Sequence, residues 1–290
     1  MSKPFDTIAL IGKYNSPEIG DSLLRLAAFL QEHHRRVLVE TRTAECVRIA
    51  GYSVATLDEI GRRADLAVVL GGDGTMLNIA CSLFSYGVPL VGINLGRLGF
   101  LADVSPDTML KTVEKIFEGE YQTEDRFLLT VTIRRQNENI FEGHAFNDTV
   151  VSKGATARLI ELEVFMDGEF VYSQRSDGLI IATPTGSTAY ALSAGGPVLH
   201  PTLEALVLVP ICPHTLSNRP IAVNSQSTLE VLLTQANGAR VHFDNQRHFD
   251  LQTNDRVIVR RTPQTVRLLH PLGHSYYGML REKLHWGKKL

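Results

Sequence analysis

An acidic residue stands inside a glycine-rich turn. The run Gly71-Gly72-Asp73-Gly74-Thr75 follows an apolar strand and precedes a helix. Glycines let a backbone turn tightly and approach a ligand, and a helix N-terminus offers N–H groups to an anion. A carboxylate there would repel a phosphate unless it held a hydroxyl nucleophile or Mg²⁺. The spacing matches neither a dinucleotide fingerprint nor a Walker A loop, so the turn indicates another kind of phosphate chemistry, with an ordinary Asp-Gly turn as the alternative.

A polar pair and a hydroxyl-rich loop stand in the second half of the chain. Asn147 and Asp148 interrupt an apolar strand, where a polar pair can also mark an edge or a bulge. The loop reads T-P-T-G-S-T-A-Y from Thr183 to Tyr190, and small residues follow it. It offers many hydrogen-bond donors, little bulk and one aromatic ring on which a base can stack. Its length and order favour a nucleoside site over an ordinary Ser/Thr turn.

The glycine turn resembles the phosphate-binding turn of the superfamily that contains NAD kinase, diacylglycerol kinase and phosphofructokinase. The turn alone does not choose among them, but four other segments do. They are N-L-G-R-L-G-F-L-A-D at Asn94–Asp103, P-T-G-S-T-A-Y at Pro184–Tyr190, C-P-H-T-L-S-N-R-P at Cys212–Pro220 and D-N-Q at Asp244–Gln246. Together they are closely similar to bacterial NAD kinase of the Gram-negative type, and the resemblance covers essentially the whole chain.

The resemblance implies transfer of the γ-phosphoryl group of ATP to the 2′-hydroxyl of the adenosine ribose of NAD⁺, which gives ADP and NADP⁺. Asp73 would be the catalytic residue that binds the ribose and accepts its hydroxyl proton, and Mg²⁺ or another divalent cation is expected with the ATP. The phosphate-binding turn would consist of Gly71, Gly72, Gly74 and Thr75. The implied NAD-binding residues are Asp73, Gly74, Asn147, Asp148, Arg158, Arg175, Asp177, Thr188, Ala189, Tyr190, Ala191, Leu192, Ser193 and Gln246.

One position departs from the family pattern. The family has Asn-Glu where this chain has Asn147-Asp148, and the shorter acid reaches less far toward a ribose. Arg158 and Arg247 stand near matched positions whose residue types vary in the family. Three other functions are alternatives. A diacylglycerol-type lipid kinase should lack the hydroxyl-rich loop, a non-catalytic NAD- or NADP-binding module would not need Asp73, and a dehydrogenase would need a dinucleotide fingerprint.

The elements that must position these residues change in kind near Arg126. Before it, apolar strands alternate with amphipathic helices, as in a parallel sheet that helices cover on both faces. Helices are expected to start at Ser16 and Ser105, because each serine is followed by a proline and an acid. The expected strands are Thr7–Gly12, Arg36–Glu40, Asp65–Leu70 and Val88–Asn94.

After Arg126 the chain reads as mostly β, and the last residues read as a helix with a basic tail. Asp167-Gly168 is a hairpin signal. The expected strands are Phe127–Ile133, Ile140–Ser152, Leu159–Phe165, Phe170–Gln174, Leu179–Thr183, Ser227–Thr234, Arg240–Phe243, Arg256–Arg261 and Thr265–His270.

These patterns predict an α+β protein with two domains. Residues 1–125 would form an α/β phosphate-binding domain with a parallel, Rossmann-like sheet. Residues 126–274 would form a β-rich, two-sheet nucleotide-binding domain, and the helix at 275–290 would pack back on the first domain. A site that draws on both halves would lie in the crevice between them.

The composition sets further limits. The net charge of −2 gives no reason to expect nucleic acid or an acidic membrane as a partner. The partners that the resemblance implies are NAD⁺ and ATP. Three cysteines without a C-x-x-C motif argue against a disulfide framework or a cysteine zinc site. No segment approaches the roughly 18 apolar residues of a membrane span, so a cytoplasmic location is expected. The resemblance suggests a homodimer or homotetramer with the β-rich half as the interface.

No metal ligands are assigned from the sequence. His270 and His274 are four residues apart, which is a metal-binding spacing on a helix. Pro271 and Gly273 stand between them and exclude a regular helix there.

Overall fold

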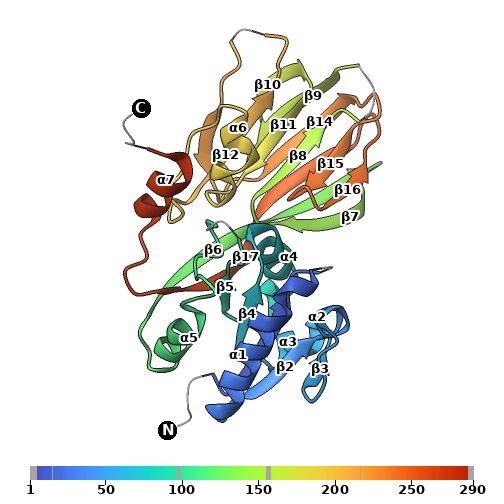
Figure 1. Ribbon diagram of the computed structural model, residues 1–290. Helices are drawn as coiled ribbons and strands as arrows, with labels where there is room; N and C mark the ends of the chain where they lie inside the picture. Colours follow the sequence, from blue (N-terminus) through green and yellow to red (C-terminus); the bar gives the residue numbers. More distant parts are fainter. Residues whose placement is uncertain (1–4, 15, 97–98, 155–157, 216, 287–290) are drawn as a thin grey trace. The chain divides into compact units, whose positions relative to one another are not determined.

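The computed structural model describes residues 5–14, 16–96, 99–154, 158–215 and 217–286 (Figure 1). The chain divides into two compact units. The first unit comprises Met1–Asp125 and Thr265–Leu290, and the second comprises Arg126–Gln264. Residues 265–274, which the sequence analysis places in the β-rich domain, are therefore part of the first unit.

A parallel sheet forms the centre of the first unit. In spatial order its strands are β3 (Ser53–Ala55), β2 (Arg36–Glu40), β1 (Thr7–Gly12), β4 (Leu66–Leu70) and β5 (Leu90–Ile93), and the end of β17 (Arg256–Pro271) pairs in parallel with β5. Every residue of β1, β4 and β5 is buried. Burial on both faces explains why these strands are apolar without alternation. The predicted parallel α/β architecture is confirmed.

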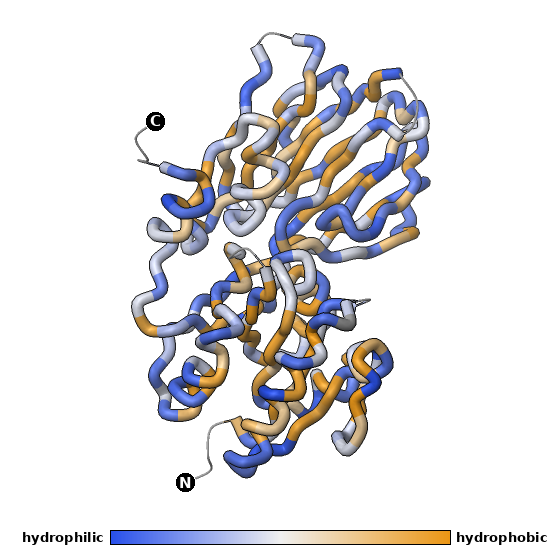
Figure 2. The backbone as a smooth tube through the Cα atoms, in the orientation of Figure 1, coloured by the Kyte–Doolittle hydropathy of each residue, from blue (hydrophilic) through white to orange (hydrophobic). Residues whose placement is uncertain are grey.

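Helices connect the strands of the first unit. On α1, Leu23, Leu26, Ala27 and Leu30 share one face and are fully buried, as their spacing predicts. Figure 2 shows hydrophobic residues gathered along the central strands. None of the helices in the described part of the chain is long and apolar enough to cross a membrane. The helices of this unit are η1 (Pro17–Ile19), α1 (Gly20–Glu32), α2 (Thr41–Val47), α3 (Leu57–Arg63), α4 (Asp73–Leu83), η2 (Phe84–Tyr86), α5 (Met109–Phe117) and α7 (Tyr276–Leu284).

Two helices begin later than predicted. The Ser16 hydroxyl donates to the Glu18 carboxylate, and the short η1 precedes α1. The Ser105 hydroxyl accepts a hydrogen bond from the Asp107 N–H at 3.1 Å, and α5 begins only at Met109. In both places the serine side chain stabilises a turn that leads into the helix, because a short hydroxyl side chain can bond groups two residues away.

Two sheets built from antiparallel strand pairs form the second unit, which confirms the predicted β-rich, two-sheet fold. Asp167-Gly168 joins β9 to β10 with φ values of 51° and 86°, as expected for a tight hairpin. The six-stranded sheet has the order β13 (Ile221–Asn224), β12 (Ala205–Ile211), β11 (Gly178–Ala182), β8 (Asp148–Ser152), β15 (Arg240–Phe243) and β16 (Arg247–Asp250). The other contains β10 (Glu169–Ser176), β9 (Ile160–Met166), β14 (Leu229–Gln235) and β17, with β6 (Tyr121–Arg135) and β7 (Glu138–Ala145) attached.

The core of the second unit draws on both of its sheets. Val151 of β8, Leu179 of β11 and Val231 of β14 are fully buried in one apolar cluster. Beside this core, the fully buried carboxylate of Asp255 accepts two hydrogen bonds from the Arg135 guanidinium, each of 2.8 Å. The bidentate pair compensates a charge that would otherwise be costly to bury.

Candidate functional site

The glycine turn connects the end of β4 to the start of α4, and Asp73 is the first residue of that helix. A Cβ on Gly71 would lie 2.5 Å from the Thr75 hydroxyl oxygen, so glycine is needed for the helix to start this close to the strand. A Cβ on Gly72 or Gly74 would meet no heavy atom of the described residues within 4 Å. The turn therefore leaves space beside its backbone where a ligand can approach.

The Asp73 carboxylate binds three consecutive backbone N–H groups. Its Oδ2 accepts from Phe100 at 2.8 Å, and its Oδ1 accepts from Leu101 at 2.9 Å and Ala102 at 3.1 Å. An ordinary turn aspartate bonds the backbone next to it instead. A carboxylate has about four acceptor positions, three of which these bonds use. One position is left for a further donor such as a ribose hydroxyl.

The motif that resembles the family at Asn94–Asp103 is the loop that holds Asp73. Asn94 holds this loop together, because its side chain donates to the Ala102 carbonyl at 3.2 Å and accepts from the Gly96 N–H at 2.8 Å. A Cβ on Gly99 would collide with Oδ1 of Asp73. The loop and the aspartate therefore fit together only when residue 99 is glycine.

A cavity of about 510 Å³ opens in the second unit. It lies against β8, the start of α6 (Tyr190–Ser193), the strand β15 and the turn that follows β15. Its volume is that of a small-molecule site. The lining residues are Asn147, Asp148, Val150, Ser152, Ala189, Tyr190, His242, Asp244 and Asn245.

Asp244 fixes the backbone on one side of this cavity. Asp244 and Asn245 have φ values of 50° and 54°, so together they form a tight left-handed turn between β15 and β16. The Asp244 carboxylate accepts the N–H groups of Phe146 at 2.8 Å, Asn147 at 2.7 Å and Asp148 at 3.1 Å. This contact holds the predicted polar pair in the cavity wall.

Asp148 is a buried acid in this wall. Burial, and secondly the negative charge of Asp244, raise the pKa of Asp148 to about 7. Near neutral pH its carboxyl group is therefore protonated in a large fraction of molecules. It can then donate a hydrogen bond as well as accept one.

The hydroxyl-rich loop is held by its own side chains. The Thr183 hydroxyl donates to the Phe146 carbonyl at 2.7 Å, and the Ser187 hydroxyl accepts from the Leu199 N–H at 2.9 Å. Both hydroxyls are fully buried and hold the loop in shape. The loop ends at Tyr190, whose side chain is 48% exposed and lines the cavity. Its ring is free to stack on a ligand.

The cavity brings together four of the residues predicted to bind NAD, namely Asn147, Asp148, Ala189 and Tyr190. Asp177 lies outside its lining and pairs with Lys153 at 2.7 Å. Arg175 also lies outside, with its Nε 3.6 Å from a carboxylate oxygen of Glu161. The other predicted residues of this unit that do not line it are Arg158, Thr188, Ala191, Leu192, Ser193 and Gln246. Asp73, Gly74 and the rest of the phosphate-binding turn lie in the first unit.

Five of the lining residues were not predicted from the sequence to belong to the site. Val150 and Ser152 alternate with Asp148 along β8, so two-residue periodicity would place them on one face. His242 is the cross-strand partner of Val150. Asp244 and Asn245 were noted only as part of a sequence motif. The signal that could have predicted their turn is that both are residue types that tolerate positive φ.

These features define a class of protein before any comparison is made. A parallel α/β unit carries a glycine turn and a held carboxylate at a helix start, which suits phosphoryl transfer to a hydroxyl. A β-rich unit carries a cavity with an accessible aromatic ring, which suits a nucleoside. The class is that of nucleotide-binding phosphotransferases.

Comparison with known proteins identifies the family. The ATP-NAD kinase N-terminal domain matches residues 8–121, and the ATP-NAD kinase C-terminal domain matches residues 146–271. The NAD kinase of Thiobacillus denitrificans is 54% identical over 290 residues, which is the full length of both chains. That of Nitrosospira multiformis is 56% identical over 286 residues, which cover 99% of this chain and 97% of the relative. The chain therefore belongs to the ATP-NAD kinase family.

Two solved structures agree with this result. Yeast NADH kinase complexed with NADH has a TM-score of 0.91 and 25% identity, over all of this chain and 90% of that one. An NAD kinase from Archaeoglobus fulgidus in complex with ATP has a TM-score of 0.76 and 26% identity, over 96% of this chain and 98% of that one. The resemblance seen in the sequence is confirmed, and the activity is that of an NAD kinase rather than of a lipid kinase, a dehydrogenase or a non-catalytic module.

Proposed function

We propose that Asp73 orients the 2′-hydroxyl of the adenosine ribose of NAD⁺ and accepts its proton as the γ-phosphoryl group of ATP is transferred. The observation that carries this role is the set of three N–H bonds that hold the carboxylate at the start of α4. Phosphoryl transfer passes through a loose transition state, so the protein contributes mainly by aligning the reacting groups. A carboxylate that is already held in place loses little freedom when it aligns a hydroxyl.

With three acceptor positions used, the Asp73 carboxylate keeps one position, which suits a single ribose hydroxyl. Mg²⁺ is expected to arrive on the phosphates of ATP and to neutralise part of their charge. The open space beside Gly72 and Gly74 suits phosphate oxygens near the N-terminus of α4.

The cavity of the second unit is proposed to hold a nucleoside part of the substrates. Tyr190 would stack on a base, and Asn147 and Asp148 would bond a ribose. The partly protonated carboxyl of Asp148 can donate to one ribose hydroxyl and accept from another, which offsets its shorter reach. The resemblance implies NAD contacts for further residues of this unit, and we propose them on that ground alone. They are Arg158, Arg175, Asp177, Thr188, Ala191, Leu192, Ser193 and Gln246.

The two solved relatives support NAD and ATP as the ligands of this chain, because one was crystallised with NADH and the other with ATP. We also infer that the enzyme is cytoplasmic. From the resemblance we infer that it uses a divalent cation and assembles as a homodimer or homotetramer.

A coupled assay tests the proposed reaction. Purified protein is incubated with NAD⁺, ATP and MgCl₂, and NADP⁺ is measured with an NADP-specific dehydrogenase. NADP⁺ should form only when all three are present, and excess EDTA should abolish its formation. Turnover that continues in EDTA would contradict the divalent-cation requirement, and phosphate found on a position other than the 2′-hydroxyl would contradict the proposed nucleophile.

A further inference from the structure

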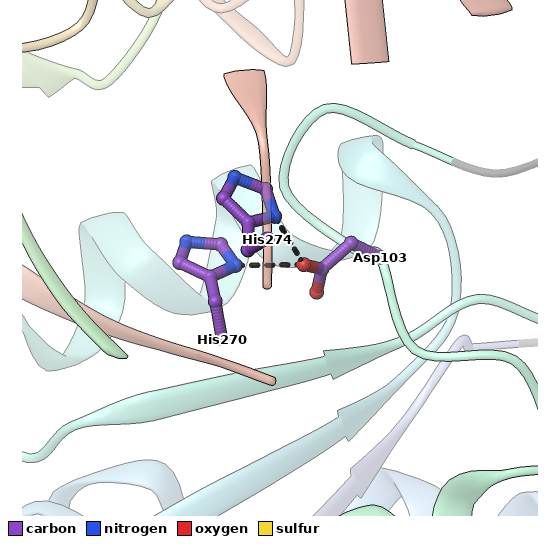
Figure 3. Close-up of side chains that lie close together, drawn as sticks. All are labelled: Asp103, His270 and His274. Atoms are coloured by element: carbon purple, nitrogen blue, oxygen red, sulfur yellow. Dashed lines mark hydrogen bonds and ion pairs between the residues drawn. The ribbon is translucent and has the colours of Figure 1, made fainter. Parts of the chain in front are cut away.

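Three side chains that the proposed reaction does not use converge in the first unit (Figure 3). Nδ1 of His270 lies 2.9 Å from Oδ2 of Asp103, and Nδ1 of His274 lies 2.8 Å from the same oxygen. The two imidazole rings stack with centroids 4.0 Å apart and planes 18° from parallel. One carboxylate oxygen and two imidazole nitrogens thus meet at one place.

The backbone fixes where these side chains meet. Asp103 precedes Val104, which forms a parallel bridge with Ile93 at the end of β5. His270 stands near the end of β17, and the His274 N–H donates to the Pro271 carbonyl at 3.1 Å. The proline and glycine between the histidines do exclude a helix, but the turn that they form places the two rings on the same side.

Two further observations point to a cation at this place. Oδ1 of Asp103 is buried and has no hydrogen-bond partner among the described residues, and the side chain as a whole is 5% exposed. Nε2 of His270 is also buried without a hydrogen-bond partner among the described residues, and Oε2 of Glu124 lies 3.4 Å from it. A carboxylate on this side is placed to orient a histidine that binds metal through its other nitrogen.

We propose that Asp103, His270 and His274 form a binding site for a first-row transition-metal dication. Two imidazoles and one carboxylate with open positions are a ligand set for such ions, whereas Mg²⁺ and Ca²⁺ prefer oxygen ligands. The site is therefore distinct from that of the Mg²⁺ expected with ATP. A cavity of about 340 Å³, lined by Asp103, His274 and Glu282 among others, adjoins it and has room for water ligands.

The separations of 2.9 Å and 2.8 Å between the imidazole nitrogens and the Asp103 oxygen bring three ligand atoms close enough to bind one ion after a small rotation of a ring. His274 lies on a turn and its side chain is 12% exposed, so its ring can rotate toward an ion without disturbing the core.

A metal at this site would stabilise the loop that holds Asp73. Asp103 follows Ala102, whose N–H donates to the Asp73 carboxylate at 3.1 Å. The ion would join this loop to the end of β17 and the turn before α7. Its chief expected effect is thermal stability of the first unit.

The test uses Co²⁺ as the probe, with untagged, nucleotide-free protein that has been dialysed against a chelator. Calorimetry gives affinity and stoichiometry, visible absorption reports coordination, and calorimetric unfolding gives the melting temperature. The wild type should bind one Co²⁺ per chain with a change in its visible absorption and should melt several degrees higher when loaded. His274→Phe, which keeps a stacked ring but removes the ligand atom, should bind at least tenfold more weakly. His285→Asn, which changes an exposed histidine at the end of α7, should bind as the wild type does.

Two outcomes would overturn the site: no Co²⁺ binding by the wild type, or equal affinity in His274→Phe. Either would mean that the cluster is held by hydrogen bonds alone. If His274→Phe does not fold, Glu124→Gln keeps all three ligand atoms and should lower Co²⁺ affinity by about 10-fold to 100-fold. Unchanged affinity in that variant would then overturn the proposal.

Discussion

Two aspartates of this chain hold backbone loops in the same way. Asp73 accepts the N–H groups of residues 100–102, and Asp244 accepts those of residues 146–148. Each carboxylate accepts three backbone N–H groups. The role of Asp244 is structural, because its bonds fix the backbone of the cavity wall that contains Asn147 and Asp148. Asp73 stands beside the open glycine turn, which is why the reaction is assigned to it.

The exposed ring of Tyr190 gives a prediction about substrate affinity. If the ring stacks on the substrate in both the ground state and the transition state, Tyr190→Ala should raise KM for NAD⁺ more than it lowers kcat. Tyr190→Phe keeps the stacking surface and should stay close to the wild type. Steady-state kinetics with varied NAD⁺ measures both constants, and an unchanged KM in Tyr190→Ala would exclude the residue from substrate binding.

The pKa of Asp148 gives a prediction about stability and pH. An aspartate in an unfolded chain has a pKa of about 3.9, whereas burial and the charge of Asp244 raise the pKa of Asp148 to about 7. The folded protein therefore binds this proton more tightly, and folding becomes less favourable as pH rises from about 4 to about 7. Between pH 4 and pH 7 the free energy of unfolding of the wild type should fall by on the order of 2–4 kcal/mol relative to that of Asp148→Asn.

Urea unfolding at intervals between pH 4 and pH 8 measures this difference. Glu169→Gln, which changes an exposed acid of the same unit, is the control and should follow the wild type. Stability curves of wild type and Asp148→Asn that run parallel between pH 4 and pH 8 would show that the Asp148 carboxyl titrates normally.

At the scale of elements, the loop from Asn94 to Asp103 is as important to the site as the glycine turn. A Cβ on Gly99 would collide with the Asp73 carboxylate, so Gly99→Ala should displace that carboxylate and lower kcat by about 10-fold or more. A Cβ on Gly96 would have Asn94 Oδ1 as its nearest neighbour at 3.8 Å, so Gly96→Ala is the matched control and should keep its activity. Equal kcat in both variants would mean that the loop does not position Asp73.

The elements that the sequence predicts best are those whose burial is uniform. The run Thr7–Gly12 is apolar throughout and became β1 with the same bounds. Helix α2 was not predicted, because it begins directly after β2 without an apolar periodicity and depends on Glu40, which accepts the N–H groups of Arg42 and Thr43. Strand β12 was not predicted either, and its Pro210 lacks the N–H group that a strand normally offers.

In the site, too, some residues could be predicted from the sequence and others could not. Asn147, Asp148 and Tyr190 were noticed as a polar pair in an apolar strand and as the aromatic residue of a hydroxyl-rich loop, and the resemblance implied their role in binding NAD. His242 was not predicted, since it enters the cavity wall only through the register of β15 against β8. The turn at Gly273 likewise brings His270 and His274 together through tertiary geometry that a helix-spacing rule does not describe.

At the scale of the whole molecule, strand β10 supports the predicted oligomer. It lies at the edge of its sheet, and its Phe170 and Val171 side chains are 54% and 39% exposed. Exposed apolar residues on an edge strand are typical of contact surfaces. Sedimentation should therefore give a mass that is two or four times the 32.1 kDa of one chain. Phe170→Glu should lower the sedimentation mass toward that of one chain. Val54→Glu, at an equally exposed residue of the first unit, should leave the mass unchanged.

A wild-type mass of one chain at micromolar concentration would contradict the predicted assembly. An unchanged mass for Phe170→Glu would place the contact elsewhere than on β10.

The central claim is that Asp73 takes part in the reaction itself, and Asp73→Asn tests it most directly. Asparagine keeps the size of the side chain and an oxygen that can accept from Leu101 and Ala102. Its NH₂ group replaces the oxygen that accepts from Phe100, so the charge, the proton-accepting oxygen and one N–H bond are lost. Calorimetric binding of NAD⁺ and the NADP⁺-forming rate are measured on the same preparation, with Asp21→Asn as the control because it makes the same change in the first turn of α1. NAD⁺ should bind within a few-fold of the wild type while kcat falls by about 10² to 10⁴, the range for losing a general base. An Asp73→Asn enzyme that keeps at least a third of wild-type kcat would contradict the account.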